Sequence, residues 1–137
     1  MEPRWISLKS ALAIHDRQLA EHGGQRGIRD MNGLQSALAR PQNLLAYKSP
    51  PPSLIRLAAG YAFGICRNHP FLDGNKRTAA VVCLTFLGKN GIKLIASEAD
   101  LADTFERLAA GKLTEKRLAQ WFENVSVPMK KSAKKAD

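Results

Sequence analysis

Residues 53–90 read SLIRLAAGYAFGICRNHPFLDGNKRTAAVVCLTFLGKN, two apolar stretches separated by a polar junction. In the first stretch, apolar residues recur at the spacing of one helix face, which predicts a helix capped by Ser53 and running to about Asn68. The second stretch, over residues 75–90, is apolar around nearly its whole circumference, which predicts a central, buried helix that ends at Gly91. We therefore expect the other helices to pack around this second helix.

Amphipathic patterns on either side predict four more helices. Residues 7–22 form the first, and Asp30 caps a second that should end before Pro41, because proline disfavours helical geometry in the residue before it. A long, proline-containing surface loop then leads to the helix capped by Ser53. The last two helices begin at the predicted caps Ser97 and Thr114. Since no convincing set of strands is present, the expected fold is all-α, a compact six-helix bundle.

The composition is that of one soluble globular domain, with 137 residues of which 45% are apolar and 24% charged. No apolar run approaches the roughly 18–20 residues that cross a bilayer. The amino terminus also lacks the apolar segment of a secretory signal, so we expect a cytoplasmic protein. The two cysteines, Cys66 and Cys83, have neither the spacing nor the neighbours of a disulfide framework or a zinc site.

The chain is basic, with a net charge of +9. Part of this charge lies in residues 128–137, a Lys-rich end whose lack of apolar residues predicts a disordered tail after a domain over residues 1–127. The remaining excess suggests an acidic partner, which could be nucleic acid, a nucleotide or an acidic protein. A solvated basic surface without a specific partner is the alternative that charge alone leaves open.

Polar residues concentrate at the junction between the two middle helices, residues 68–79, which read NHPFLDGNKRTA. Polar groups at such a place are costly unless they pair with each other or with a ligand. The second helix turns its unpaired first-turn N–H groups and its positive dipole end toward the junction, and Gly74 lets a phosphate approach the backbone closely. The junction therefore predicts a polyphosphate site, in which phosphate oxygens could also bind the side chains of Arg67, Asn75, Lys76 and Arg77.

Two further residues of the junction suit the chemistry of a bound nucleotide. Asp73 is a hard oxygen ligand for Mg²⁺, which usually binds through one or two carboxylates together with substrate phosphates. His69 is a candidate base, because the cations around it disfavour its protonated form and leave it able to accept a proton from a hydroxyl group. Each residue also has a purely structural interpretation, as a turn or a helix end. His15, on the apolar stripe of the first helix, is expected to be a core histidine bonded to backbone.

The run over residues 69–77, HPFLDGNKR, resembles the signature of the Fic/Doc superfamily, H-x-F-x-[DE]-x-N-[GK]-R. The resemblance extends over roughly residues 8–125. Typical Fic AMP-transferases have Gly at the position of Lys76 and a second Arg at the position of Ala80, and both departures match the death-on-curing (Doc) branch. The resemblance therefore implies a six-helix Fic/Doc-type bundle, and a type II toxin–antitoxin toxin that acts as a protein kinase.

The same resemblance implies a reaction and partners. The γ-phosphoryl group of ATP would pass, in the presence of Mg²⁺, to a threonine hydroxyl of elongation factor Tu and so arrest translation. The cognate antitoxin would be Phd-like, with an acidic inhibitory segment, and the basic charge of this chain is compatible with it. Neither a membrane nor direct nucleic-acid binding is implied. A Fic-type AMP-transferase and a non-catalytic basic binding protein remain as alternatives.

Overall fold

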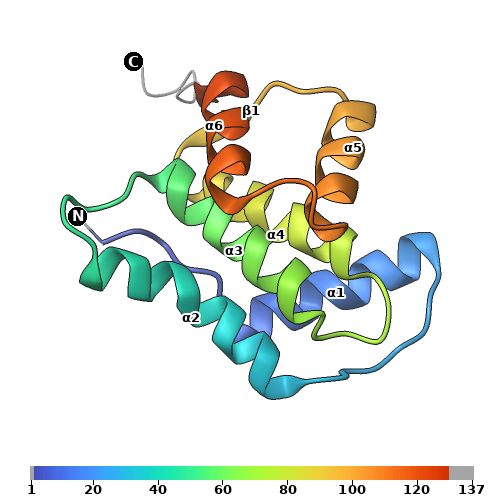
Figure 1. The fold of residues 1–137 in the computed structure, drawn as a ribbon. Coiled ribbons are helices and arrows are strands. Elements are labelled where there is room, and N and C mark those ends of the chain that lie inside the picture. The colour runs from blue at the N-terminus through green and yellow to red at the C-terminus, as the bar shows by residue number, and fades with distance from the viewer. Residues whose placement is uncertain (1, 130–137) are drawn as a thin grey trace, which may run out of the picture.

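Helices dominate the computed structural model, which describes residues 2–129 and confirms the all-α fold (Figure 1). The six helices follow in the order α1 (Leu8–His22), α2 (Met31–Tyr47), α3 (Leu54–Asn68), α4 (Asn75–Lys89), α5 (Glu98–Ala109) and α6 (Glu115–Val125). Two short strands, β1 (Ile92–Leu94) and β2 (Ser126–Pro128), complete the described chain.

Five of the helices begin at a side-chain cap, in which an oxygen accepts a hydrogen bond from the N–H group three residues later. These caps are Ser7, Asp30, Ser53, Ser97 and Thr114. Capping of this kind satisfies first-turn N–H groups that have no partner inside the helix. The exception is α4, which begins at Gly74 and has no side-chain cap.

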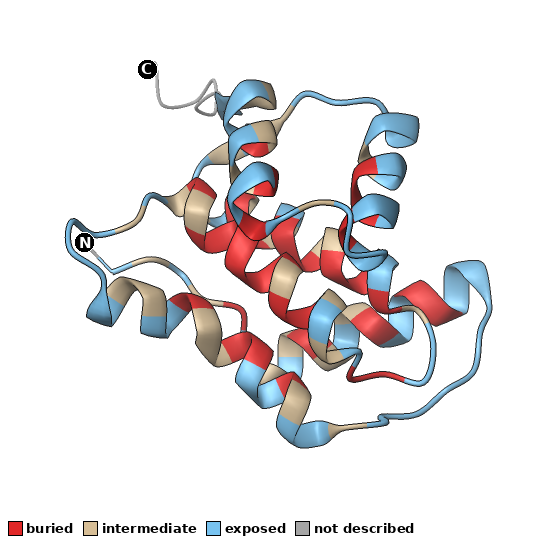
Figure 2. Cartoon of the chain, in the orientation of Figure 1, coloured by how far each residue is buried: buried red, intermediate tan, exposed pale blue. Residues whose placement is uncertain are grey.

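The helix at the centre of the bundle is α3, which buries nine of its fifteen residues. It packs against α2, α4 and α6, and Figure 2 shows the buried residues concentrated there. We expected residues 75–90 in this central place, but α4 buries one face only. On its other side Ala80, Val81 and Leu84 line a pocket, and Leu84 is 36% exposed. One apolar side of α4 thus belongs to the core, and the other forms part of a pocket wall.

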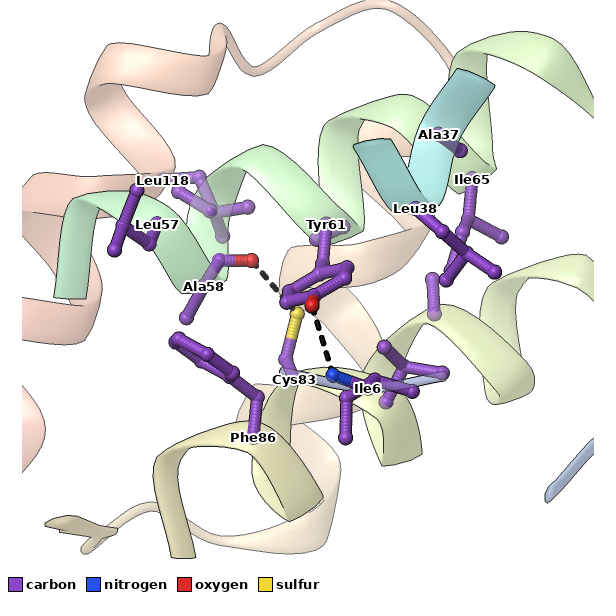
Figure 3. Close-up of a cluster of buried hydrophobic side chains, with 14 of the residues drawn as sticks. Ile6, Ala37, Leu38, Leu57, Ala58, Tyr61, Ile65, Cys83, Phe86 and Leu118 are labelled. Atoms are coloured by element: carbon purple, nitrogen blue, oxygen red, sulfur yellow. Dashed lines mark hydrogen bonds between the residues drawn. The ribbon is translucent and has the colours of Figure 1, made fainter. Parts of the chain in front are cut away.

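Tyr61 of α3 connects the core to the amino-terminal segment, as the close-up in Figure 3 shows. Its hydroxyl oxygen accepts a hydrogen bond from the Ile6 N–H group at 2.9 Å, and its ring meets the edge of the Phe86 ring of α4. Burial raises the pKa of Tyr61 to about 12. The Cys83 thiol donates to the Ala58 carbonyl, so α3 and α4 are also joined by a polar contact inside the core.

Helix α2 continues past the point where the sequence predicted its end. It runs through Pro41 to Tyr47, so the expectation of a helix ending before Pro41 is wrong, and the loop that follows spans only residues 48–53. Proline lacks the N–H group that would bond to the Ala37 carbonyl. Packing offsets this loss, because Pro41 is buried and a Cβ atom at Gly60 of α3 would lie only 3.6 Å from it. The two helices approach closely at Gly64 of α3, where a Cβ atom would lie 3.0 Å from the Ala37 Cα atom.

A buried carboxylate ties α6 to the two helices beside it. Glu115 accepts hydrogen bonds from the guanidinium groups of Arg40 in α2 and Arg56 in α3, at 2.5 and 2.9 Å. Burial alone would raise the pKa of Glu115, but the two guanidinium groups outweigh burial and hold it below its usual value. The Glu115 carboxylate is therefore ionised at neutral pH and stabilises the junction of three helices.

The strand pair was not expected, since three-residue strands are too short to give an alternating pattern. β1 and β2 are antiparallel, with Lys93 opposite Val127, and the Met129 N–H group donates to the Gly91 carbonyl at 2.9 Å. Pro128 and Met129, assigned from the sequence to the tail, therefore pair with β1 and the turn before it. The rest of the expected tail, residues 130–137, lies outside the described residues. No helix in residues 2–129 is long and apolar enough to span a membrane.

Candidate functional site

The loop between α3 and α4 is bracketed by two left-handed residues. His69 ends α3 at φ 48° and ψ 56°, and Gly74 begins α4 at φ 79° and ψ 17°. His69 is the one non-glycine residue of the described chain with a positive φ. Because this conformation is unfavourable for a side chain with a Cβ atom, contacts from the surroundings must hold it.

Asn75 closes this loop from inside. Its Oδ1 atom accepts a hydrogen bond from the Phe71 N–H group at 3.0 Å, and its Nδ2 atom donates to the Phe71 carbonyl at 2.9 Å. Both residues are buried. We predicted Asn75 as a phosphate ligand, and in this structure its side-chain amide group bonds to the backbone of Phe71.

His15 supports the same loop from α1. It is 3% exposed, its ring stacks on the Phe71 ring with centroids 3.7 Å apart, and its Nε2–H group donates to the Asp73 carbonyl at 2.8 Å. The prediction of a core histidine bonded to backbone is confirmed. Its partner belongs to the candidate site, so His15 helps to set the shape of the loop.

The open end of α4 faces a pocket of about 810 Å³ between α4 and α5. Six of the seven predicted site residues line it: His69, Asp73, Gly74, Asn75, Lys76 and Arg77. Since Gly74 offers no cap, the first-turn N–H groups remain available to an anion. On the opposite side, α5 contributes the apolar side chains of Leu101 and Phe105 together with the carboxylates of Glu98 and Glu106. The pocket thus combines a cationic end, at the start of α4, with a mixed apolar and acidic side formed by α5.

Arg67 is the predicted residue that lies elsewhere. It lines an adjacent pocket of about 630 Å³, and its guanidinium carbon lies 5.6 Å from the centre of the Phe63 ring. Cys66 and Ala109 line both pockets, so the two adjoin. Burial raises the pKa of Cys66 to about 12, which keeps this thiol protonated at neutral pH and unsuited to act as a nucleophile.

Asp73 presents an ionised carboxylate at the mouth of the main pocket. Its oxygens accept hydrogen bonds from the N–H groups of Gln25, at 3.1 Å, and Gly74, at 2.9 Å. These two backbone donors hold the pKa of Asp73 below its usual value, with a smaller contribution from the charge of Arg77. A carboxylate has about four lone-pair positions, so capacity for a metal ion remains.

Within residues 2–129, no three His, Cys, Asp or Glu side chains converge where they could hold a metal ion by themselves. A Mg²⁺ ion needs six oxygen ligands and commonly takes most of them from phosphates and water. Asp73 therefore fits the role of a single protein ligand to an ion that enters together with a polyphosphate.

The sequence analysis did not identify two residues that contact the predicted site residues. Glu106 of α5 forms an ion pair with Lys76 across the main pocket, at 2.5 Å. Arg29, in the segment between α1 and α2, donates to the carbonyls of Asn68 and His69. No local pattern could have revealed either contact, because the partners lie 30 to 40 positions apart in the chain.

Comparison with known proteins identifies the family. A family model described as the Fic/DOC family matches residues 5–87, more than half of the chain, and the protein therefore belongs to the Fic/Doc family. Protein kinase doc of Escherichia phage P1 is 33% identical over 116 residues, which cover 85% of this chain and 90% of that protein. Toxin Doc of Mycolicibacterium smegmatis is 42% identical over 74 residues, 54% of this chain and 57% of that protein. Within the family, the chain is thus similar to Doc toxins.

Proposed function

We propose that this protein is the toxin of a type II toxin–antitoxin module, and that it is a protein kinase that uses ATP. The observation that carries the proposal is the placement of His69 beside the uncapped first turn of α4 in one pocket. An anion site next to a residue that can accept a proton is what phosphoryl transfer to a hydroxyl group requires. The similarity to a protein named as a kinase supports the same activity.

The triphosphate of ATP would bind at the amino-terminal end of α4. Its oxygens would accept hydrogen bonds from the first-turn N–H groups and from Lys76 and Arg77, with Arg67 contributing from the adjacent pocket. Lys76 would exchange its contact with Glu106 for a contact with phosphate. Asp73 would hold Mg²⁺ together with the phosphate oxygens, and the bound ion supplies positive charge against that of the triphosphate.

His69 would act on the acceptor. Its imidazole accepts the proton of the acceptor hydroxyl as that oxygen forms its bond to the γ-phosphorus atom, and the bond from phosphorus to ADP breaks. The main task of the remaining residues is to hold the two reactants in line. We propose a threonine of elongation factor Tu as the acceptor, on the family resemblance alone, which would arrest translation in the cytoplasm.

A transfer experiment tests this proposal against the alternative of AMP transfer. The purified protein, free of antitoxin, is incubated with elongation factor Tu and Mg²⁺, using ATP labelled at either the γ or the α phosphate. We expect the label in elongation factor Tu only from the γ position, with the modified threonine identified by mass spectrometry. Label that comes only from the α position would replace the kinase assignment with AMP transfer, and no label from either would refute both for this acceptor.

The antitoxin is proposed to be Phd-like, with an acidic segment that binds the basic toxin. The chain offers Arg67 and Lys116 on the adjacent pocket and Arg77 on the main pocket as cations at its surface. Binding that weakens steeply with increasing salt is the expected behaviour of such a complex. Salt-independent binding would argue against an acidic contact.

A further inference from the structure

We propose that Arg29 is a positioning residue, which sets the orientation of the His69 imidazole by holding the last carbonyls of α3. Its Nε–H group donates to the His69 carbonyl at 2.7 Å, and its Nη2 group donates to the Asn68 carbonyl at 2.8 Å. The inference rests on the proposed role of His69 as the residue that accepts the proton of the acceptor.

The main chain around Arg29 is tied to the same loop. The N–H groups of Arg29 and Asp30 both donate to the Pro70 carbonyl, at 2.7 and 3.0 Å. The Leu72 N–H group, two residues after Pro70, donates to the carbonyl of Gly27, two residues before Arg29, at 3.1 Å. Residues 27–30 therefore lie along the loop that carries His69, and the Arg29 side chain reaches the one position at which this loop leaves α3.

The contacts of Arg29 stabilise the end of α3 in two ways. The last carbonyls of a helix have no partner inside it and carry the negative end of the helix dipole, where a cation is favourable. His69 is moreover in a left-handed conformation that a residue with a Cβ atom adopts only when its surroundings demand it. If φ of His69 relaxed to a negative value, the bond from Cα to Cβ would turn and move the imidazole. Arg29 opposes that rotation by fixing the carbonyl of the same residue.

The fold itself does not depend on this side chain. Arg29 is exposed, and its side chain takes no part in the main-chain hydrogen bonds of residues 27–30 or in the hydrophobic core. Arg26 provides a matched control. It is an exposed arginine of the same segment, and within residues 2–129 its side chain makes no hydrogen bond or ion pair.

The test compares R29M with R26M, which lose the same charge from the same segment. For R29M we expect the kcat of phosphoryl transfer to fall about 10-fold to 100-fold, the effect of a misplaced catalytic group. The Kd for ATP with Mg²⁺, measured by calorimetry, should stay unchanged because Arg29 does not line the pocket. R26M should match the wild type in both measurements. R29K should recover part of the lost kcat, since an ammonium group can still donate to a carbonyl.

A second measurement reads the position of His69 without any reaction. The Cα and Cβ chemical shifts of His69 report its backbone conformation, and in R29M they should move away from their left-handed values while those of R26M do not. An unchanged kcat together with unchanged His69 shifts in R29M would overturn the inference, as would equal losses of kcat, ATP affinity and thermal stability. If the wild type transfers no phosphoryl group, the proposed function fails, and the His69 shifts alone then decide whether Arg29 positions this residue.

Discussion

Replacing Gly74 by alanine should destabilise the protein for a reason that is confined to the backbone. Gly74 begins α4 at φ 79°, in the left-handed region. A Cβ atom there would lie 3.5 Å from a methyl carbon of Leu19 and 3.7 Å from the His15 ring, which is ordinary contact. The penalty therefore comes from the conformation alone, and we expect the free energy of unfolding to fall by about 1–2 kcal/mol.

Replacing a glycine by alanine near the other end of α4 should have the opposite effect on the free energy of unfolding. Gly88 lies in the last turn, and a Cβ atom there would meet nothing within 4 Å. Alanine lowers the backbone entropy of the unfolded chain, so G88A should raise the free energy of unfolding by up to about 0.5–1 kcal/mol. G74N should lie between wild type and G74A, because asparagine tolerates the left-handed region better than alanine.

Urea and thermal unfolding followed by circular dichroism measure all three variants. For a chain of this length, each kcal/mol should shift Tm by roughly 3–5 °C. A G74A variant as stable as the wild type, or shifts of the same sign in G74A and G88A, would refute the conclusion that α4 begins at a left-handed residue. The geometry of the candidate anion site would then need revision.

Three further predictions concern the site and its support. H69A should lower the rate of phosphoryl transfer by about 10²–10⁴-fold with an unchanged circular dichroism spectrum; a full rate would exclude His69 as the proton acceptor. D73N should weaken the ATP binding that depends on Mg²⁺, measured by calorimetry with and without the ion, and an unchanged difference would contradict Asp73 as the ligand. E115Q should lower the free energy of unfolding at neutral pH by about 1–3 kcal/mol, because Arg40 and Arg56 lose their charged partner. Since folding lowers the pKa of Glu115, this difference should be complete above the usual value of 4.5 and shrink as the pH falls through the lower, folded value. A difference that does not depend on pH in denaturant titrations carried out on both sides of pH 4.5 would argue against this role of the carboxylate.

The starts of the helices could be predicted because the signals for them are local. A cap bonds to an N–H group three residues later, and an amphipathic face repeats within four residues, so neither needs knowledge of the rest of the fold. Ser53 and Thr114 are caps of this kind. The polar junction between the two apolar stretches was visible for the same reason, and the structure places His69, Asp73 and Lys76 from it in one pocket.

Tertiary packing decided which helix is central. The composition of residues 75–89 did not distinguish a helix buried all round from one with an apolar pocket wall, since both need apolar side chains on every side. Tertiary packing also decided the length of α2, because the cost of Pro41 depends on whether a partner helix packs against it, and α3 packs against α2 here.

By itself, therefore, the sequence determined the all-α class, the helix starts and the segment that carries the candidate site. Only the tertiary structure decided how that segment is held, through Arg29 on the His69 carbonyl and His15 on the Asp73 carbonyl. It likewise decided that Glu106 meets Lys76. The physical reason is distance along the chain: these partners lie 30 to 58 positions apart, so no local pattern records them, and they meet only once the helices have packed.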